Sequence, residues 1–439
     1  MPHRFAARVA PLRISLMLIG AVLSGLPAEA ADVLRGHGGP VRAIGVLNGG
    51  RQLVTGAFDH AIIVWDLRRG VAERVLRFHE GSVNAVLILN ESCFATGSED
   101  GRIAMWCGDA PAPQKVLNGH QGPVTSLALS PDGERLVSGS FDATVRIWNI
   151  DSGSLERTLE EHKGPVTSVR VTPDGSAVLS GGFDGLLRST PLLGGRAPRA
   201  ATFAAPVNAL VAAEDGEIVA ASSDGSVRFL TPALELVQTV EVEPSPIAAL
   251  ALAPDGSRVA ASGLKGGVAV IDRATHKITA RLVGPGLPVW SLAFDTDSRT
   301  LFTGGADRVV RHWDAIKGEP IGSVVPEPAD RVVGDPNERG AVLFRACQAC
   351  HTLTADGGNR AGPTLHGVFG RRIASVKGYA YSAGLKQLDI IWNAETIAKL
   401  FEVGPAAYTP GTKMPEQTIT DPADRKALVD WLERVTRPR

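Results

Sequence analysis

The residues best suited to chemistry in this chain are Cys347, Cys350 and His351, within the run Cys-Gln-Ala-Cys-His. Two thiols three positions apart and followed directly by an imidazole form the attachment pattern of c-type haem, in which the thiols become thioethers and the histidine binds iron. A zinc site would need two more ligands, and the C-terminal region has only one other histidine and no other cysteine. A redox dithiol normally belongs to a βαβ unit, which the flanking sequence does not predict. We therefore predict one covalently attached haem c per chain.

A second iron ligand can be sought among the methionines, because a thioether suits haem iron. Two of the four methionines fall within the first thirty residues and a third falls in a repeat region, which leaves Met414. His366 is an alternative, and its spacing from His351 does not decide between the two.

These residues belong to a region whose pattern predicts helices. Residues 326–334 contain prolines and a glycine and are predicted to be a linker. Asp335-Pro336 is typical of a helix N-cap followed by proline at the first helical position. We therefore predict a small all-α domain over residues 335–439.

The longer N-terminal part of the chain repeats with a period near forty-one residues. Each unit has two runs of alternating apolar residues separated by a turn such as Ser-Pro-Asp-Gly, so it predicts four short strands. The seven units align on an apolar residue at Val41, Val83, Val124, Val166, Val207, Ile247 and Val289.

The pairs Gly36-His37 with Trp65-Asp66, and Gly119-His120 with Trp148-Asn149, resemble the WD-repeat β-propeller family. The resemblance implies an all-β, seven-bladed propeller over residues 31–325, and a hydrogen-bonded tetrad of His, Ser or Thr, Asp and Trp within a blade. Three units match the tetrad in full: His37, Thr55, Asp59 and Trp65; His79, Thr96, Asp100 and Trp106; His120, Ser138, Asp142 and Trp148. Because these groups recur once per unit, we interpret them as structural and not as catalytic.

Two ways of closing the ring are open. Residues 33–34 or residues 321–325 could supply the outer strand of the last blade. We favour the N-terminal strand, because joining both ends of the ring leaves only protected edges.

Residues 335–436 resemble class I cytochrome c, and closely its mitochondrial type. The match rests on Gly362-Pro363-Thr364-Leu365-His366-Gly367, on Gly378-Tyr379-Ala380-Tyr381-Ser382, on Ile390-Ile391-Trp392, and on Tyr408-Thr409-Pro410-Gly411-Thr412-Lys413-Met414-Pro415. The architecture expected for the whole chain is therefore an all-β propeller followed by a small all-α cytochrome c domain.

The resemblance implies that Met414 is the sixth iron ligand and that His366 is structural. It implies that the carbonyl of Pro363 accepts a hydrogen bond from His351. Two positions depart from the family, since Leu385 and Leu400 stand where it often has Asn and Tyr. The residues expected around the haem propionates are Arg371, Tyr381, Trp392 and Thr412.

The first thirty residues have the pattern of a secretory signal peptide. A basic start is followed by an apolar run over residues 14–26 and by Ala28-Glu29-Ala30, a small-x-small cleavage site. Thirteen apolar residues are too few to span a bilayer. We expect a mature chain that starts at Ala31, has no membrane span and lies in the periplasm of a Gram-negative bacterium. The remaining cysteines, Cys93 and Cys107, could then be paired or reduced.

The function expected from these features is electron transfer. A haem with His and Met ligands has no open position for a substrate, and the propeller is interpreted as a platform for a docking protein. The redox partner would be another cytochrome, an oxidase or a dehydrogenase. A net charge of −1 argues against nucleic acid as a partner. The alternative is an oxidoreductase with its catalytic site on the propeller and the cytochrome domain as its electron port.

Overall fold

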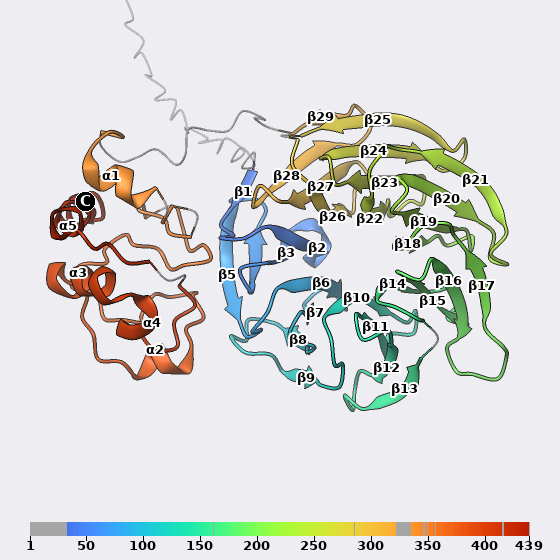
Figure 1. Cartoon of the computed structure of the whole chain (residues 1–439), viewed down its shortest axis with the longest axis horizontal. Coiled ribbons are helices and arrows are strands. Elements are labelled where there is room, and N and C mark those ends of the chain that lie inside the picture. Colours follow the sequence, from blue (N-terminus) through green and yellow to red (C-terminus); the bar gives the residue numbers. More distant parts are fainter. Residues whose placement is uncertain are drawn as a thin grey trace, which may run out of the picture.

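The computed structural model describes residues 33–160, 162–284, 286–321, 335–345, 347–348, 350–355, 357–414 and 417–438. It has two parts, a ring of strands and a small helical domain beside it (Figure 1). The predicted signal peptide (1–30) and linker (326–334) lie outside the described residues and stay predictions.

Within the described part of the chain, residues 33–321 form seven antiparallel sheets arranged as the blades of a propeller, which confirms the predicted number (Figure 1). A short 3-10 turn over Asn48–Gly50 follows the first inner strand. Taken blade by blade, the strands are β2 (Val41–Leu47), β3 (Gln52–Ala57), β4 (Ala61–Asp66) and β5 (Val71–Arg77); β6 (Val83–Ile88), β7 (Cys93–Ser98), β8 (Ile103–Cys107) and β9 (Lys115–Leu117); β10 (Val124–Leu129), β11 (Arg135–Ser140), β12 (Val145–Asn149) and β13 (Leu155–Leu159); β14 (Val166–Val171), β15 (Ala177–Gly182), β16 (Leu186–Pro191) and β17 (Arg199–Thr202); β18 (Val207–Ala212), β19 (Ile218–Ser222), β20 (Ser226–Leu230) and β21 (Leu236–Glu241); β22 (Ile247–Leu252), β23 (Arg258–Gly263), β24 (Gly267–Asp272) and β25 (Lys277–Val283); β26 (Val289–Phe294), β27 (Thr300–Gly305) and β28 (Val309–Asp314), with β1 (Val33–Arg35) and β29 (Glu319–Pro320).

The apolar residue that aligns the repeats begins the inner strand of every blade. The apolar side chains pack between neighbouring sheets, so that each blade is covered on both faces. The N-terminal strand closes the ring as predicted, because β1 pairs with β28 from Val33 opposite Arg311 onward. The short β29 pairs with the other end of β28, at Trp313 and Asp314.

The tetrads are present where the repeats predict them. In the third blade, Asp142 lies 2.8 Å from His120 Nδ1, and the Ser138 hydroxyl lies 2.8 Å from His120 Nε2. Trp148 donates its indole N–H to the same hydroxyl over 2.8 Å. The first and second blades repeat these contacts. The His, Ser or Thr, and Trp side chains are buried, the aspartates are partly buried, and the groups are bonded to one another, as a structural role requires.

The helical domain is built from α1 (Arg339–Phe344), α2 (Ala383–Gln387), α3 (Ala394–Val403), α4 (Pro405–Tyr408) and α5 (Pro422–Val435). Helices α1 and α5 cross at Gly340, whose missing side chain makes room for Trp431. The ring of Phe344 packs on the indole of Trp431 with their centres 5.2 Å apart. None of the helices that the structure describes combines the length and apolarity of a membrane-spanning segment.

The predicted start of the first helix was wrong. Asp335 does not cap α1 but holds a turn, since its carboxylate accepts from the Asn337 N–H and its carbonyl accepts from the Glu338 N–H. An Asx turn of this kind satisfies the same donors that an N-cap would satisfy, so the two are hard to tell apart in a sequence.

Cys93 and Cys107 form a disulfide bond. They face each other directly on β7 and β8, and the register of this strand pair decides a question that the sequence left open.

Candidate cofactor site

The helical domain borders a cavity of about 640 Å³, a size typical of cofactor sites. Much of its wall is apolar and includes Phe344, Leu365, Val368, Ile397 and Phe401. The described lining does not include His366. It does include all the site residues expected from the sequence: Cys347, Cys350, His351, Pro363, Arg371, Tyr381, Trp392, Thr412 and Met414.

Backbone hydrogen bonds hold Cys347, Cys350 and His351 together after α1. The N–H groups of Cys350 and His351 both donate to the carbonyl of Cys347, over 3.1 and 3.0 Å. The imidazole Nδ1 of His351 lies 2.7 Å from the carbonyl oxygen of Pro363, which is the expected hydrogen bond. Burial lowers the pKa of His351 to about 4, so the ring is neutral at pH 7. With Nδ1 donating to Pro363, Nε2 is the nitrogen available to a metal.

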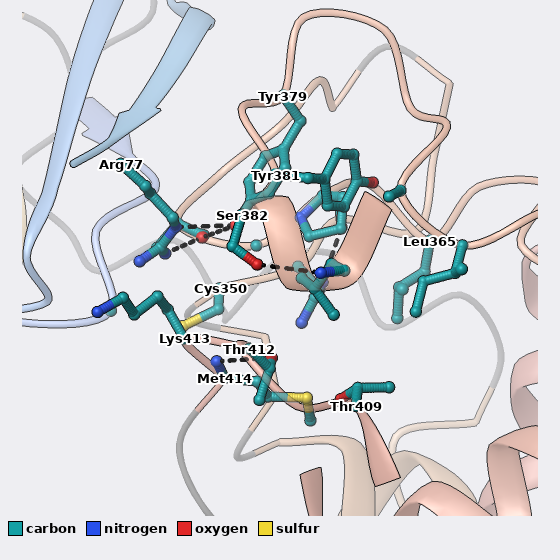
Figure 2. A pocket seen from close by; sticks show the side chains of 18 of the residues that line it. Arg77, Cys350, Leu365, Tyr379, Tyr381, Ser382, Thr409, Thr412, Lys413 and Met414 are labelled. Carbon is teal, nitrogen blue, oxygen red and sulfur yellow. Dashed lines mark hydrogen bonds between the residues drawn. The ribbon is translucent and has the colours of Figure 1, made fainter. Parts of the chain in front are cut away.

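Met414 reaches the cavity from the loop that follows α4. Its backbone N–H donates to the Thr412 hydroxyl over 3.1 Å, and the Thr412 N–H donates to the Thr409 carbonyl over 3.0 Å. Figure 2 shows Thr412 beside the thioether of Met414. The hydroxyl of Thr412 therefore holds the methionine loop in shape.

Arg371, Tyr381 and Trp392 are the polar or amphipathic residues of the expected set. The guanidinium of Arg371 donates to the carbonyls of His366 and Thr364 over 2.9 and 2.7 Å, which ties down the loop before it. Burial raises the pKa of Tyr381 to about 12, so its hydroxyl keeps its proton as a donor. That these groups surround haem propionates stays a prediction.

Leu385 and Leu400 both line the cavity. The positions at which the sequence departs from the cytochrome pattern therefore present apolar side chains to the cofactor site.

The sequence did not predict that the propeller would also line this cavity. Gly38, Asp59, Arg77 and Glu80 belong to its wall, together with Lys413 of the helical domain. Lys413 forms an ion pair with Glu80 across the two domains.

Burial alone would raise the pKa of Asp59. The neighbouring His37, the guanidinium of Arg77 and the N–H of Ala61 outweigh this effect and hold the pKa at about 2. A carboxylate is therefore present at the edge of the cavity at neutral pH, paired with His37 at 3.1 Å.

Comparisons with known proteins agree with this architecture. The family described as "WD domain, G-beta repeat" matches residues 29–66, 70–107, 111–149, 153–189 and 276–314. The cytochrome c family matches residues 337–436. Cytochrome c of Cochliobolus lunatus is 46% identical over 101 residues, which cover 23% of this chain and 93% of that protein. This chain belongs to the cytochrome c family. Cytochrome c of Arabidopsis thaliana is 45% identical over 101 residues, covering 23% of this chain and 89% of that protein. That of Gibberella zeae is 41% identical over 107 residues, covering 24% of this chain and all of that protein.

The cofactor of the cytochrome c domain is covalently attached haem c. The site fits this group, because its two thiols, neutral imidazole and thioether face one cavity of largely apolar lining. The cytochrome domain is an electron-transfer module, and the WD-repeat propeller is a protein-interaction module.

Proposed function

We propose that this protein is an exported electron carrier in which His351 and Met414 bind the haem iron and the propeller docks a partner protein. The observation that carries the proposal is that both side chains line the cavity that Cys347 and Cys350 line, whereas His366 lies outside its described lining. Bound haem c supplies a one-electron iron couple. His351 and Met414 would hold the iron of that group, the apolar walls exclude water, and the carbonyl of Pro363 orients His351.

Export to the periplasm of a Gram-negative bacterium is supported by two independent features. The N-terminal residues have the charge, apolar run and cleavage site of a signal peptide. The Cys93–Cys107 disulfide is of a kind that persists in oxidising compartments and is rare in the cytosol. Sequencing the N-terminus of the mature protein tests the proposal: it should begin at Ala31, and an intact residue 1 would overturn it.

Docking on the propeller is supported by exposed aromatic side chains on neighbouring blades. Phe141 and Phe183 occupy equivalent turns, are 45% and 50% exposed, and pack against each other with ring centres 5.8 Å apart. Exposed apolar pairs of this kind are typical of protein-binding surfaces. A protein held there would meet the haem domain at a high effective concentration, because both belong to one chain.

Carbon monoxide tests the ligation, because it binds ferrous haem only where an axial position is open or labile. We expect no spectral change when carbon monoxide is added to the reduced wild-type protein at neutral pH, and a clear adduct in Met414→Ala. His366→Ala is the matched control and should behave as wild type. A carbon monoxide adduct of the wild-type protein, or of His366→Ala alone among the variants, would overturn the proposed carrier.

A further inference from the structure

The haem cavity is closed on one side by the propeller and not by the cytochrome domain. The propeller side of its wall consists of two turns, residues 38–39 and 58–60, and of residues 77, 78 and 80 at the end of β5. In Figure 1 the helical domain lies against the blade that contains β5, and in Figure 2 Arg77 reaches from the propeller to Tyr379. The two domains therefore share one site.

Gly38 allows the closest approach. A Cβ atom at this position would lie 2.6 Å from the sulfur of Cys350, one of the two haem-attachment residues. The φ angle of Gly38 is outside the left-handed region, so its own backbone does not require glycine. In the next three units the residue after the tetrad histidine is Glu80, Gln121 or Lys163. Among the four units that have the tetrad histidine, the first is the one with glycine here.

Arg77 fastens the two domains together from the end of β5. Its Nε donates to the Tyr379 hydroxyl over 2.9 Å, and its Nη2 donates to the carbonyl of Ala361. The Tyr379 hydroxyl donates to the same carbonyl over 2.7 Å. The residues at the position of Arg77 in the next two repeats, two residues before His120 and His162, are Asn118 and Glu160. Both are exposed to solvent. Arg35 is the corresponding residue on β1, so Arg77 differs from its counterparts in its contact with the cytochrome domain and not in being an arginine.

Backbone hydrogen bonds and apolar contacts extend this interface between the two domains. The Ala361 N–H donates to the carbonyl of Gly36 over 2.6 Å, and the Ala380 N–H donates to the carbonyl of Val75 over 3.2 Å. Tyr379 packs against the apolar core of the first blade. An exposed edge strand, β5, thus finds partners in the cytochrome domain instead of in another protein.

We propose that the first blade of the propeller is a cap on the haem site, which closes the Cys350 side of the cavity against water and foreign proteins. The cap shapes the cofactor's environment, because excluding water disfavours the more positive ferric state, while the charges of Arg77 and Asp59 on the same wall oppose each other. Removing the cap should therefore lower the reduction potential. The proposal rests on haem occupying this cavity and does not depend on Met414 as a ligand.

The Gly38→Gln variant tests the cap, because it places the residue of the third unit against Cys350. Lys163→Gln is the matched control at the equivalent position of the fourth unit, whose blade is not part of the cavity wall. Two quantities are measured on the full-length haem protein: hydrogen exchange of the Ala361 and Ala380 amides, and the reduction potential. We expect faster exchange and a lower potential in Gly38→Gln, and wild-type values in Lys163→Gln.

Unchanged exchange in Gly38→Gln, or faster exchange with an unchanged potential, would overturn the cap. If Gly38→Gln fails to fold, Arg77→Ala gives the same test without steric pressure and should show the same two changes. Arg77→Lys keeps the charge, so its reduction potential should fall less below the wild-type value than that of Arg77→Ala. Carbon monoxide spectra of the same samples report on Met414 separately, so a failure of the carrier proposal can be told from a failure of the cap.

Discussion

The Ser138→Ala variant tests whether the repeated histidines and aspartates hold the blades together. The Ser138 hydroxyl bonds with two buried side chains, His120 Nε2 and Trp148 Nε1, each at 2.8 Å. Alanine leaves both without a partner inside the blade. Because an unsatisfied buried polar group costs about 1–3 kcal/mol, we expect the free energy of unfolding to fall by about 2–6 kcal/mol.

The fourth blade provides a matched comparison within the same chain. Ser180 lies 2.8 Å from His162 Nε2, but Thr190 stands where the first three blades have tryptophan, so there is no indole for Ser180 to accept from. Ser180→Ala should therefore cost about 1–3 kcal/mol. The difference between the two variants measures the bond to Trp148.

The assay is urea unfolding of the full-length protein, followed by the fluorescence of the propeller and by the haem absorbance. Ser138→Thr is the conservative control, because the first two blades use Thr55 and Thr96 at this position. The urea midpoint of Ser138→Thr should be close to that of wild type. Equal losses in Ser138→Ala and Ser180→Ala, or no loss in either, would refute the reasoning.

Three further changes follow from individual contacts. The pKa of Asp59 is about 2 in the folded chain against an ordinary value of 3.8, so its ionised form stabilises the fold above about pH 4 and loses this effect as the pH falls toward 2. Urea midpoints of Asp59→Asn should accordingly fall less steeply than those of wild type over this range. Replacing Cys93 and Cys107 together by serine removes a crosslink spanning 14 residues and should cost about 3 kcal/mol in urea unfolding, as should reduction of the wild-type disulfide. Gly340→Ala places a Cβ 2.5 Å from the Ala427 carbonyl and should lower the stability of the cytochrome domain by about 1–3 kcal/mol, measured from the thermal loss of the haem spectrum.

Local and periodic features of this protein could be predicted from its sequence. The seven blades follow from the repeat period, and the tetrads follow because each blade places the same side chains at the same positions. Cys347, Cys350 and His351 lie within five residues, so their joint chemistry is visible without a fold. Met414 was found by elimination and by family resemblance, and the structure brings it to the same cavity.

The shared wall of the haem site could be decided only by the tertiary structure. Arg77 and Tyr379 are 302 residues apart in the sequence, and their hydrogen bond depends on how two separately folding domains dock. No periodicity marks such a contact, since it occurs once and joins an edge strand to a loop. The pairing of Cys93 with Cys107 was likewise set by strand register. The sequence by itself therefore determined the two domains and the attachment residues of the haem, whereas the packing of one domain on the other decided which side of the haem site is closed.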